Sequence, residues 1–363
     1  MIGVLCTSYP RGPDDHAGSF VRTRVHALAA AGQAVEVIAA GAGSEWTEDR
    51  VRVFRVPAAR AAQIFYAGGA PEALESGGFG RRARAWLEAG QFTARMTALV
   101  AQHAAGWNAV ESHWLAPSAL VACAAAPHLH HRAHAHGGDV FLLARLPGGA
   151  SLARLLCRSG TELVFASADL RERFARLCGD SPEALGARTL VEPAPYDSLL
   201  FRPRPADERH NLRGRLGLAR FTVLAAGRLV PIKGFDVLVR AVGHLPLWVR
   251  PTLVIAGTGP EEPRLRRLAA ACAVDLRLPG LLSPTRLAEW MTAADLFVHP
   301  CRSLPNGRSE GSPVVVREAL AAGLYVVASA EGGLPELDGR ERLTLVAPDD
   351  PSALAAKIAL AMA

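Results

Sequence analysis

The chain has 363 residues, of which 50% are hydrophobic and 20% are charged. This composition excludes a wholly disordered or collagen-like protein and provides enough apolar surface for two packed domains. The chain has 40 Lys and Arg residues and 34 Asp and Glu residues, which gives a net charge of +6. The basic residues are mixed with acidic ones and lack the aromatic pattern of nucleic-acid modules, so we expect no nucleic-acid partner and attribute the excess to a phosphorylated ligand.

The sequence predicts a cytoplasmic protein. Its longest unbroken apolar run, residues 119–126, is far shorter than a bilayer span, and residues 1–8 have no basic segment followed by a long apolar one. Six cysteines are scattered without close spacing, which predicts neither a disulfide framework nor a Cys-x-x-Cys metal site.

Short β-rich runs alternate with longer helical stretches from the N-terminus onward. Residues 2–8 form an apolar run that predicts a strand, and a turn-rich loop leads to a helical pattern over 19–31. Two further apolar runs, 35–40 and 51–56, predict strands. This β-loop-α-β order is typical of a parallel sheet with crossover helices.

A proline-rich stretch separates two such series. Prolines between 193 and 205 predict an interdomain linker over 196–211, with one domain at 1–195 and another at 212–363. Beyond it we expect strands at 221–226, 252–256, 295–299 and 325–329, and helices at 235–242, 261–273, 284–293, 313–322 and 351–362. The predicted fold class is therefore α/β, with two Rossmann-like doubly wound domains facing across a cleft that binds the ligand.

The strongest local motif is Gly-Arg-Leu-Val-Pro-Ile-Lys-Gly at 227–234, which follows a predicted strand and opens a helix. Arg228 and Lys233 are two cations near the positive end of a helix dipole, an arrangement suited to a diphosphate. The alternative is a solvated basic loop. We favour the diphosphate because Lys233 is one of only two lysines in the chain.

A second motif places two glutamates around a helix start. Ser312 is a good N-cap and Pro313 a good first-turn residue, so we expect the helix to begin there, with Glu310 before it and Glu318 inside it. The N–H groups at such a helix start form an anion site. The two carboxylates could then hold hydroxyls at both ends of one ligand; taken singly, each would be a dipole-stabilising or solvated residue.

Taken together, the motifs resemble the retaining glycosyltransferases of the two-Rossmann GT-B architecture, family 4 (glycosyltransferase group 1). The resemblance covers nearly the whole chain, and the Glu-x7-Glu segment combined with the Arg/Lys pair carries most of its specificity. The matching segments are 7–10, 18–22, 113–117, 136–140, 227–234, 257–259, 294–298, 310–318 and 332–336.

The resemblance implies a role for each matching residue. As catalytic residues, Arg228 and Lys233 would hold the donor diphosphate, Glu310 would bind sugar hydroxyls near the anomeric carbon, and His136 would lie beside the transferred sugar. Glu318 would bind the nucleotide ribose. The implied donor-binding set is completed by Gly18, Gly257, Leu281, Gly311, Ser312, Pro313 and Val314; the N–H groups of Gly311, Ser312 and Val314 would face the distal phosphate, and Pro313 has none.

The implied activity is a hexosyl transfer from a nucleoside-diphosphate sugar (UDP- or GDP-linked) to a saccharide, a lipid-linked or a small-molecule acceptor, with retention of configuration. No cofactor or metal is expected, because fixed cations and helix N–H groups can stabilise the departing phosphate. Two alternatives stay open: a sugar-nucleotide epimerase or hydrolase on the same scaffold, and a non-catalytic nucleotide-sugar-binding protein.

Four features depart from this pattern or allow a second interpretation. Glu192–Asp197 replaces the family's usual Asn-Gly, and the terminal crossover helix that returns to the first domain is expected to be missing. A histidine cluster at 128–136 could bind zinc, but we expect no metal there. The basic, amphipathic stretch 81–100 is interpreted as a core-packing helix; the alternative is peripheral contact with the inner face of a membrane.

Overall fold

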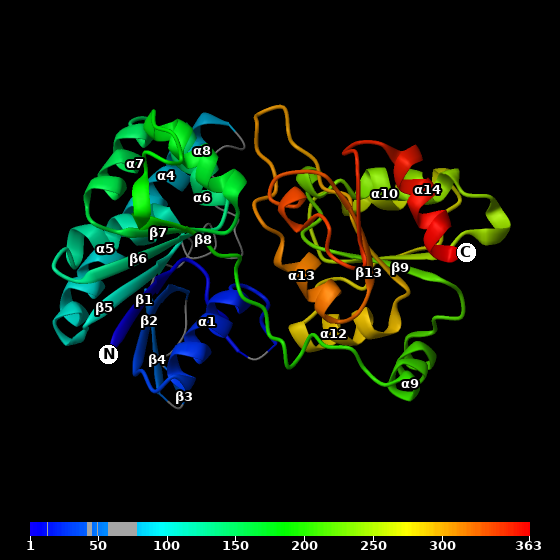
Figure 1. Cartoon of the computed structure of the whole chain (residues 1–363), viewed down its shortest axis with the longest axis horizontal. Helices are drawn as coiled ribbons and strands as arrows, with labels where there is room; N and C mark the ends of the chain where they lie inside the picture. The colour runs from blue at the N-terminus through cyan, green and yellow to red at the C-terminus, as the bar shows by residue number, and fades with distance from the viewer. Residues whose placement is uncertain (13, 42–45, 49, 57–77) are drawn as a thin grey trace. The chain divides into compact units, whose positions relative to one another are not determined.

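A computed structural model describes residues 1–363 except 13, 42–45, 49 and 57–77. The chain divides into two compact units, Met1–Pro195 and Tyr196–Ala363. Each unit is a largely parallel sheet with helices on both faces, as Figure 1 shows. The predicted class of two Rossmann-like α/β halves is confirmed.

The first unit contains an eight-stranded sheet in the order β3-β4-β2-β1-β5-β6-β7-β8, in which all pairs are parallel except β3 with β4. Its elements are β1 (Ile2–Cys6), α1 (Ser19–Ala30), β2 (Val35–Ala40), β3 (Trp46–Glu48), β4 (Val51–Val56), α4 (Phe79–His103), η2 (Ala104–Gly106), β5 (Ala109–His113), η3 (Leu115–Ala119), α5 (Leu120–Ala125), β6 (His130–Ala135), α6 (Gly138–Arg145), α7 (Gly149–Arg158), β7 (Glu162–Phe165), α8 (Ala168–Cys178), η4 (Gly186–Arg188) and β8 (Thr189–Val191).

Apolar residues on both faces of the central strands explain why helices cover both sides of this sheet. Along β1, Val4 and Cys6 pack in one core cluster with Val21 of α1, whereas Leu5 packs in another with Phe92 of α4. Successive side chains of a strand point to opposite faces, so a continuous apolar run requires a cover on each.

The second unit contains a six-stranded parallel sheet in the order β11-β10-β9-β12-β13-β14. Its elements are α9 (Ala206–Leu216), β9 (Thr222–Ala226), η5 (Pro231–Lys233), α10 (Phe235–His244), η6 (Leu247–Val249), β10 (Thr252–Ala256), α11 (Glu262–Ala271), β11 (Leu276–Arg277), α12 (Pro284–Ala293), β12 (Leu296–His299), α13 (Val314–Ala321), β13 (Tyr325–Ser329), η7 (Pro335–Leu337), β14 (Leu343–Val346) and α14 (Pro351–Met362).

Two core clusters cover the two faces of this second sheet. Val223 of β9 packs with residues of α10, α11 and α14, and Leu224 packs with residues of α9, α12 and α13. Figure 1 shows α10 and α14 on one side of the strands and α12 and α13 on the other.

A helix begins inside the range predicted as linker. Residues 196–211 lie in the second unit, and α9 starts at Ala206. Asp207 and Glu208 in its first turn and Arg213 and Arg215 in its last turn match the helix dipole. Pro203 and Pro205 therefore precede a helix, and the irregular part is shorter than the proline pattern predicts.

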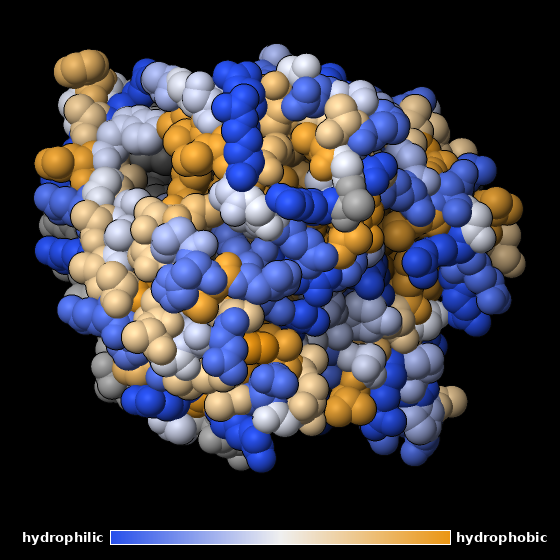
Figure 2. Space-filling model, turned by 60° about the vertical axis from the view of Figure 1, so that its left-hand side comes forward, coloured by the Kyte–Doolittle hydropathy of each residue, from blue (hydrophilic) through white to orange (hydrophobic). Residues whose placement is uncertain are grey.

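Helix α4 buries one face and exposes part of the other. Ala85, Ala89, Phe92, Met96 and Val100 are buried, as expected for a core-packing helix. The large apolar side chains exposed on it are Phe79, Trp86 and Leu87. Figure 2 shows apolar residues interspersed with hydrophilic ones on one face of the molecule. Among the described helices, none has the length and apolar character needed to cross a membrane.

The strand order reverses once in each sheet. In the first unit β1 lies between β2 and β5, and in the second β9 lies between β10 and β12. At such a reversal the loops after the two central strands diverge to opposite faces and leave a crevice at the carboxyl ends of the strands. The predicted motifs at Gly18 and Gly227–Gly234 follow β1 and β9, so the topology places them at these reversals.

Candidate active site

Lys233 and Glu310 form an ion pair at the carboxyl ends of β9 and β12. Lys233 ends the short helix η5 after β9, and Glu310 lies in the loop between β12 and α13. The Lys233 Nζ atom is 2.8 Å from Glu310 Oε1, and the two side chains are only 15% and 14% exposed. Two residues 77 positions apart in the sequence, both singled out from it, therefore meet in one buried contact.

Neighbouring charges control the ionisation of Glu310. Burial alone would raise the pKa of this carboxyl, but the Lys233 ammonium and the Arg228 guanidinium outweigh it and hold the pKa below its usual range. Arg228 therefore acts on the same carboxylate as Lys233. The predicted cation pair and Glu310 form one electrostatic group.

His299 belongs to this group and was not predicted. It ends β12, is fully buried, and neither ring nitrogen has a hydrogen-bond partner among the residues that the structure describes. Burial and the nearby Lys233 charge lower its pKa to about 3, so the ring is neutral. A histidine at the end of a predicted parallel strand was the available signal, because carboxyl ends of such strands carry sites.

The start of helix α13 differs from the prediction in one residue. Pro313, not Ser312, is the N-cap, and no side chain caps the helix. Pro313 has an extended ψ of 110°, so helical geometry begins only at Val314. The N–H groups of Val314 and Val315, the first of α13, have no partner inside the helix and are available to an anion, whereas the Val316 N–H donates to the Pro313 carbonyl at 3.2 Å. The prediction of Ser312 as the cap was wrong.

Glu318 lies one turn into α13 and has a different environment from Glu310. Burial raises its pKa to about 7, with Asp197 adding to the effect and Arg317 opposing it. Leu281, by contrast, is 55% exposed in the loop between β11 and α12. The structure thus brings Lys233, Glu310 and the Arg228 charge together. Glu318 lies further along the chain, inside the helix α13 that follows the Glu310 loop.

Two glycines allow the surrounding loops to touch this group. Gly332, with φ +57°, lies so close to the Glu310 carbonyl that an added Cβ would be 1.8 Å from that oxygen. An added Cβ on Gly257 would be 1.9 Å from the Gly227 carbonyl oxygen. Positions 257 and 332 must therefore lack a Cβ atom for the loops after β10 and β13 to pack against the predicted site.

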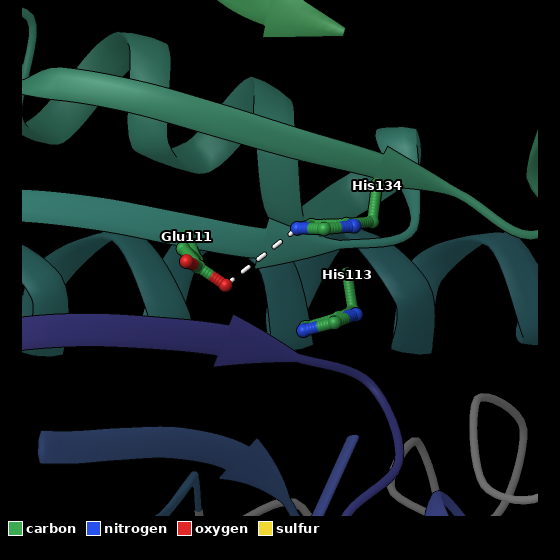
Figure 3. A group of neighbouring side chains, drawn as sticks. All are labelled: Glu111, His113 and His134. Atoms are coloured by element: carbon green, nitrogen blue, oxygen red, sulfur yellow. Dashed lines mark ion pairs between the residues drawn. The ribbon is translucent and has the colours of Figure 1, made fainter. Parts of the chain in front are cut away.

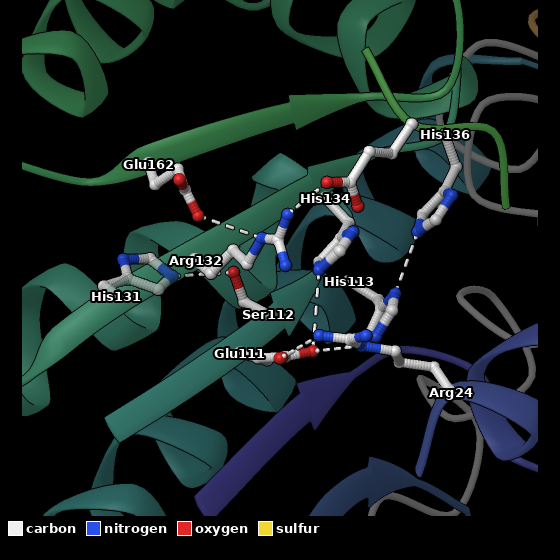
Figure 4. A network of polar contacts seen from close by, with 10 residues as sticks. Arg24, Glu111, Ser112, His113, His131, Arg132, His134, His136 and Glu162 are labelled. Atoms are coloured by element: carbon white, nitrogen blue, oxygen red, sulfur yellow. Dashed lines mark hydrogen bonds and ion pairs between the residues drawn. The ribbon is translucent and has the colours of Figure 1, made fainter. Parts of the chain in front are cut away.

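In the first unit, His136 is part of a buried polar network at the carboxyl ends of β5 and β6. Its Nε2 atom is 3.0 Å from Nδ1 of His113 (Figure 4). The centroid of its ring lies 4.6 Å from that of Phe20. Burial, with a smaller contribution from His134, lowers the pKa of His136 to about 3. Gly18 is the left-handed N-cap of α1, the helix that carries Phe20 and Arg24.

Glu111, His113 and His134 each offer one potential metal-ligand atom, and these three atoms lie within 4.8 Å of one another (Figure 3). Two features oppose coordination in this arrangement. Arg24 binds both oxygens of Glu111, at 2.6 and 3.0 Å, and the two histidine rings stack at 14°. Imidazole lone pairs lie in the ring planes, so stacked rings cannot meet at one ion without rotating.

The cluster of Glu111, His113 and His134 is therefore a polar network joined to Arg24, and not a metal site, in this geometry. Burial would raise the pKa of Glu111, but its bonds and charge interactions with His134 and Arg24 lower it to about 2. The His134 Nε2 atom lies 3.6 Å from Glu111 Oε2, and the Nε2 atom of His113 has no hydrogen-bond partner in the described part of the chain. Arg24 and Glu111 were not predicted, since nothing in their local sequence marks them. The pairing of β5 with β6 brings Glu111 and His134 onto neighbouring strands.

A cavity of about 180 Å³ adjoins the network within the first unit. Its walls combine charged and neutral polar groups with apolar ones. They include Arg24, His113, His134, His136, Val164, Ala166 and residues 192–195. The sequence that departs from the family pattern at Glu192–Pro195 therefore lines this cavity.

Comparison with solved structures identifies the class of fold. Sucrose-phosphate synthase from Thermosynechococcus elongatus superposes with a TM-score of 0.75 at 20% identity, over 99% of this chain and 89% of that one. The Anabaena protein HepE in complex with UDP-glucose gives 0.71 at 18% identity, over 99% and 89%. The fold is that of the GT-B glycosyltransferases.

The particular family follows from sequence. Residues 220–363 match the family described as "Glycosyl transferases group 1". The second unit, which contains Lys233, Glu310 and Glu318, therefore belongs to this family, and the resemblance predicted from the sequence is confirmed.

Curated relatives are similar over a larger part of the chain. A "GDP-mannose-dependent alpha-(1-6)-phosphatidylinositol monomannoside mannosyltransferase" of Mycobacterium tuberculosis is 37% identical over 265 residues, 69% of this chain. A "D-inositol 3-phosphate glycosyltransferase" of Streptomyces scabiei is 39% identical over 173 residues, 43% of this chain and 37% of its own length. The alignment with the mycobacterial relative spans 65% of that protein's length.

Proposed function

We propose that this protein is a retaining glycosyltransferase that moves a hexose from a nucleoside-diphosphate sugar to an acceptor without a metal. The observation that supports this most is the buried Lys233–Glu310 pair, at 2.8 Å, in the unit that belongs to the glycosyltransferase family. A cation beside a carboxylate provides one group for phosphate and one for sugar hydroxyls.

The negative charge that develops on the leaving group explains why the proposed site contains cations and helix N–H groups. When the bond from the anomeric carbon to the diphosphate breaks, negative charge accumulates on the departing phosphate. The Lys233 ammonium, the Arg228 guanidinium and the first N–H groups of α13 would stabilise that charge, and their fixed positions avoid a reorganisation cost. Glu310 would bind hydroxyls of the sugar and Glu318 those of the ribose.

The relatives indicate which substrates to test first. The mycobacterial relative is named as dependent on GDP-mannose, and the Streptomyces relative acts on D-inositol 3-phosphate. We therefore propose GDP-mannose as donor and an inositol-containing saccharide or lipid as acceptor. In this proposal His136 lies beside the transferred sugar, and Gly18 lets the loop after β1 approach the substrates.

The test is an acceptor-dependent transfer assay. GDP-mannose and UDP-glucose are each incubated with phosphatidylinositol monomannoside or inositol phosphate, and nucleoside diphosphate release and the anomeric configuration of the product are measured. We expect acceptor-dependent release, an α-linked product, no loss of rate with EDTA, and a fall of at least 100-fold in kcat for Lys233→Ala. Lys357→Ala is the matched control, because it removes the other lysine, which is exposed on α14.

Other outcomes would favour the alternative functions. Turnover of the donor without any acceptor would indicate a hydrolase or an epimerase. Binding of the donor by calorimetry, with no nucleoside diphosphate released against any acceptor, would indicate a binding protein. Equal kcat in Lys233→Ala and the parent would refute the proposed site.

A further inference from the structure

Two cysteines that are distant in sequence meet between helices α7 and α8. Cys157 is the penultimate residue of α7 and Cys178 is the last residue of α8. Their sulfur atoms are 3.8 Å apart; Cys178 is buried and Cys157 is partly exposed. We propose that these residues form an oxidisable thiol pair, which a peroxide converts to an intramolecular disulfide.

The geometry requires only a short movement. A disulfide has a sulfur–sulfur distance of about 2.0 Å, so rotation of the two side chains must close less than 2 Å. Cys178 is packed in a core cluster and Cys157 lies partly exposed against that cluster, so most of the rotation falls to Cys157. The 21-residue separation hides this pair from a search for closely spaced cysteines.

The environments assign different roles to the two sulfurs. The thiol of Cys178 hydrogen-bonds to Cys157 and lowers the pKa of the Cys157 thiol, and Arg158 adds a smaller effect. The same bond, together with burial, raises the pKa of Cys178. Partly exposed thiols with lowered pKa react with peroxides, so Cys157 is the attacking residue and Cys178 resolves the product.

The chemistry balances with hydrogen peroxide as the oxidant. The Cys157 thiolate attacks one peroxide oxygen, the O–O bond breaks, and the departing hydroxide takes up a proton to leave water and a sulfenic acid. The Cys178 sulfur then attacks the Cys157 sulfur, the S–S bond forms, the S–O bond breaks, and a second water leaves. Two thiols lose two electrons, and one peroxide becomes two waters.

The disulfide would restrict the motion of a segment that lines the cavity of the first unit. The closed loop contains β7 and α8, and the cavity residues Val164 and Ala166 lie at the end of β7. A crosslink over a loop of this length restricts the unfolded state, so it stabilises the first unit. The inference does not depend on the proposed transfer activity.

The experiment uses the full chain treated with hydrogen peroxide and mapped by mass spectrometry without reduction. We expect a peptide pair joined through Cys157 and Cys178, a fall from six titratable thiols to four, and a rise of about 6–10 °C in the unfolding midpoint of the first unit that dithiothreitol reverses. Cys272→Ser, which removes a cysteine of the second unit, should still lose two thiols.

Cys157→Ser should abolish the crosslink and the rise in midpoint. Oxidation of Cys157 to a sulfinic acid while Cys178 stays a free thiol would overturn the inference. So would a crosslink through any other cysteine pair. Because the peptide map is made on the unsubstituted chain, the result does not depend on whether a variant folds.

Discussion

The ion pair between Lys233 and Glu310 allows a quantitative test of the proposed site. We consider three variants: Lys233→Met, Glu310→Gln and the two combined. At 2.8 Å and an effective dielectric constant of about 20, the attraction is about 6 kcal/mol, most of it offset by desolvation. Removing one partner leaves the other buried and uncompensated. We therefore expect each single substitution to destabilise the second unit by about 2.5 kcal/mol, and the pair together by about 2 kcal/mol.

These values correspond to a coupling energy of about 3 kcal/mol, which a double-mutant cycle measures. The assay is native-state hydrogen exchange of peptides covering β9 and β12, because a chain of two units need not unfold in one step. Calorimetry should show midpoint decreases of about 5–10 °C for the single variants. Additive effects of the two substitutions, with no coupling, would refute the ion pair.

The pH dependence provides a second readout of the same pair. The pKa of Glu310 is lower in the folded protein than in the unfolded chain. Its ionised form therefore contributes stability that is present above the unfolded pKa, about 4.3, and is lost as pH falls through the folded pKa. The cost of Lys233→Met should be largest at neutral pH and smaller in acid. An equal cost at both would contradict this assignment.

Three further predictions concern other parts of the two units. If Glu318, with a pKa of about 7, binds the ribose as a carboxylate, titration calorimetry should show donor affinity falling about fivefold from pH 7 to pH 6, and Glu318→Gln should remove that dependence. Gly332→Ala should destabilise the second unit by at least 2 kcal/mol in urea unfolding, whereas Gly339→Ala, also at positive φ but in open space, should cost about 1 kcal/mol; equal costs would refute the contact with the Glu310 carbonyl. His136→Asn should lower kcat at least tenfold without changing the exchange of β6 peptides; a normal kcat would remove His136 from the site.

Much of the fold could be predicted because each strand is a short, continuous apolar run. The strands at 35–40 and 252–256 and the helix at 284–293 match the structure residue for residue. The two-residue strand β11 and the antiparallel β3 were missed, since neither has an apolar run of its own. Short edge strands owe their conformation to pairing with a neighbour, which a local pattern does not contain.

The sequence singled out candidate site residues where residues close in sequence share one loop or one helix start. Arg228 and Lys233 fall on one strand-to-helix turn, and Glu310 and Glu318 flank one helix start. The Arg24–Glu111 pair could not be predicted in this way, because its members are 87 residues apart and meet only through the docking of α1 on the sheet. His299 had a local signal, its position at the end of a predicted strand, but its neighbours are set by the pairing of β9 with β12.

The proposed function depends on the binding of a diphosphate by the Lys233 side chain. Isothermal titration of GDP and of guanosine against the parent chain and Lys233→Met measures it directly. We expect the substitution to weaken GDP binding at least 30-fold, about 2 kcal/mol, and to leave guanosine binding unchanged. Equal affinity of both proteins for GDP, with a folded variant, would contradict the claim.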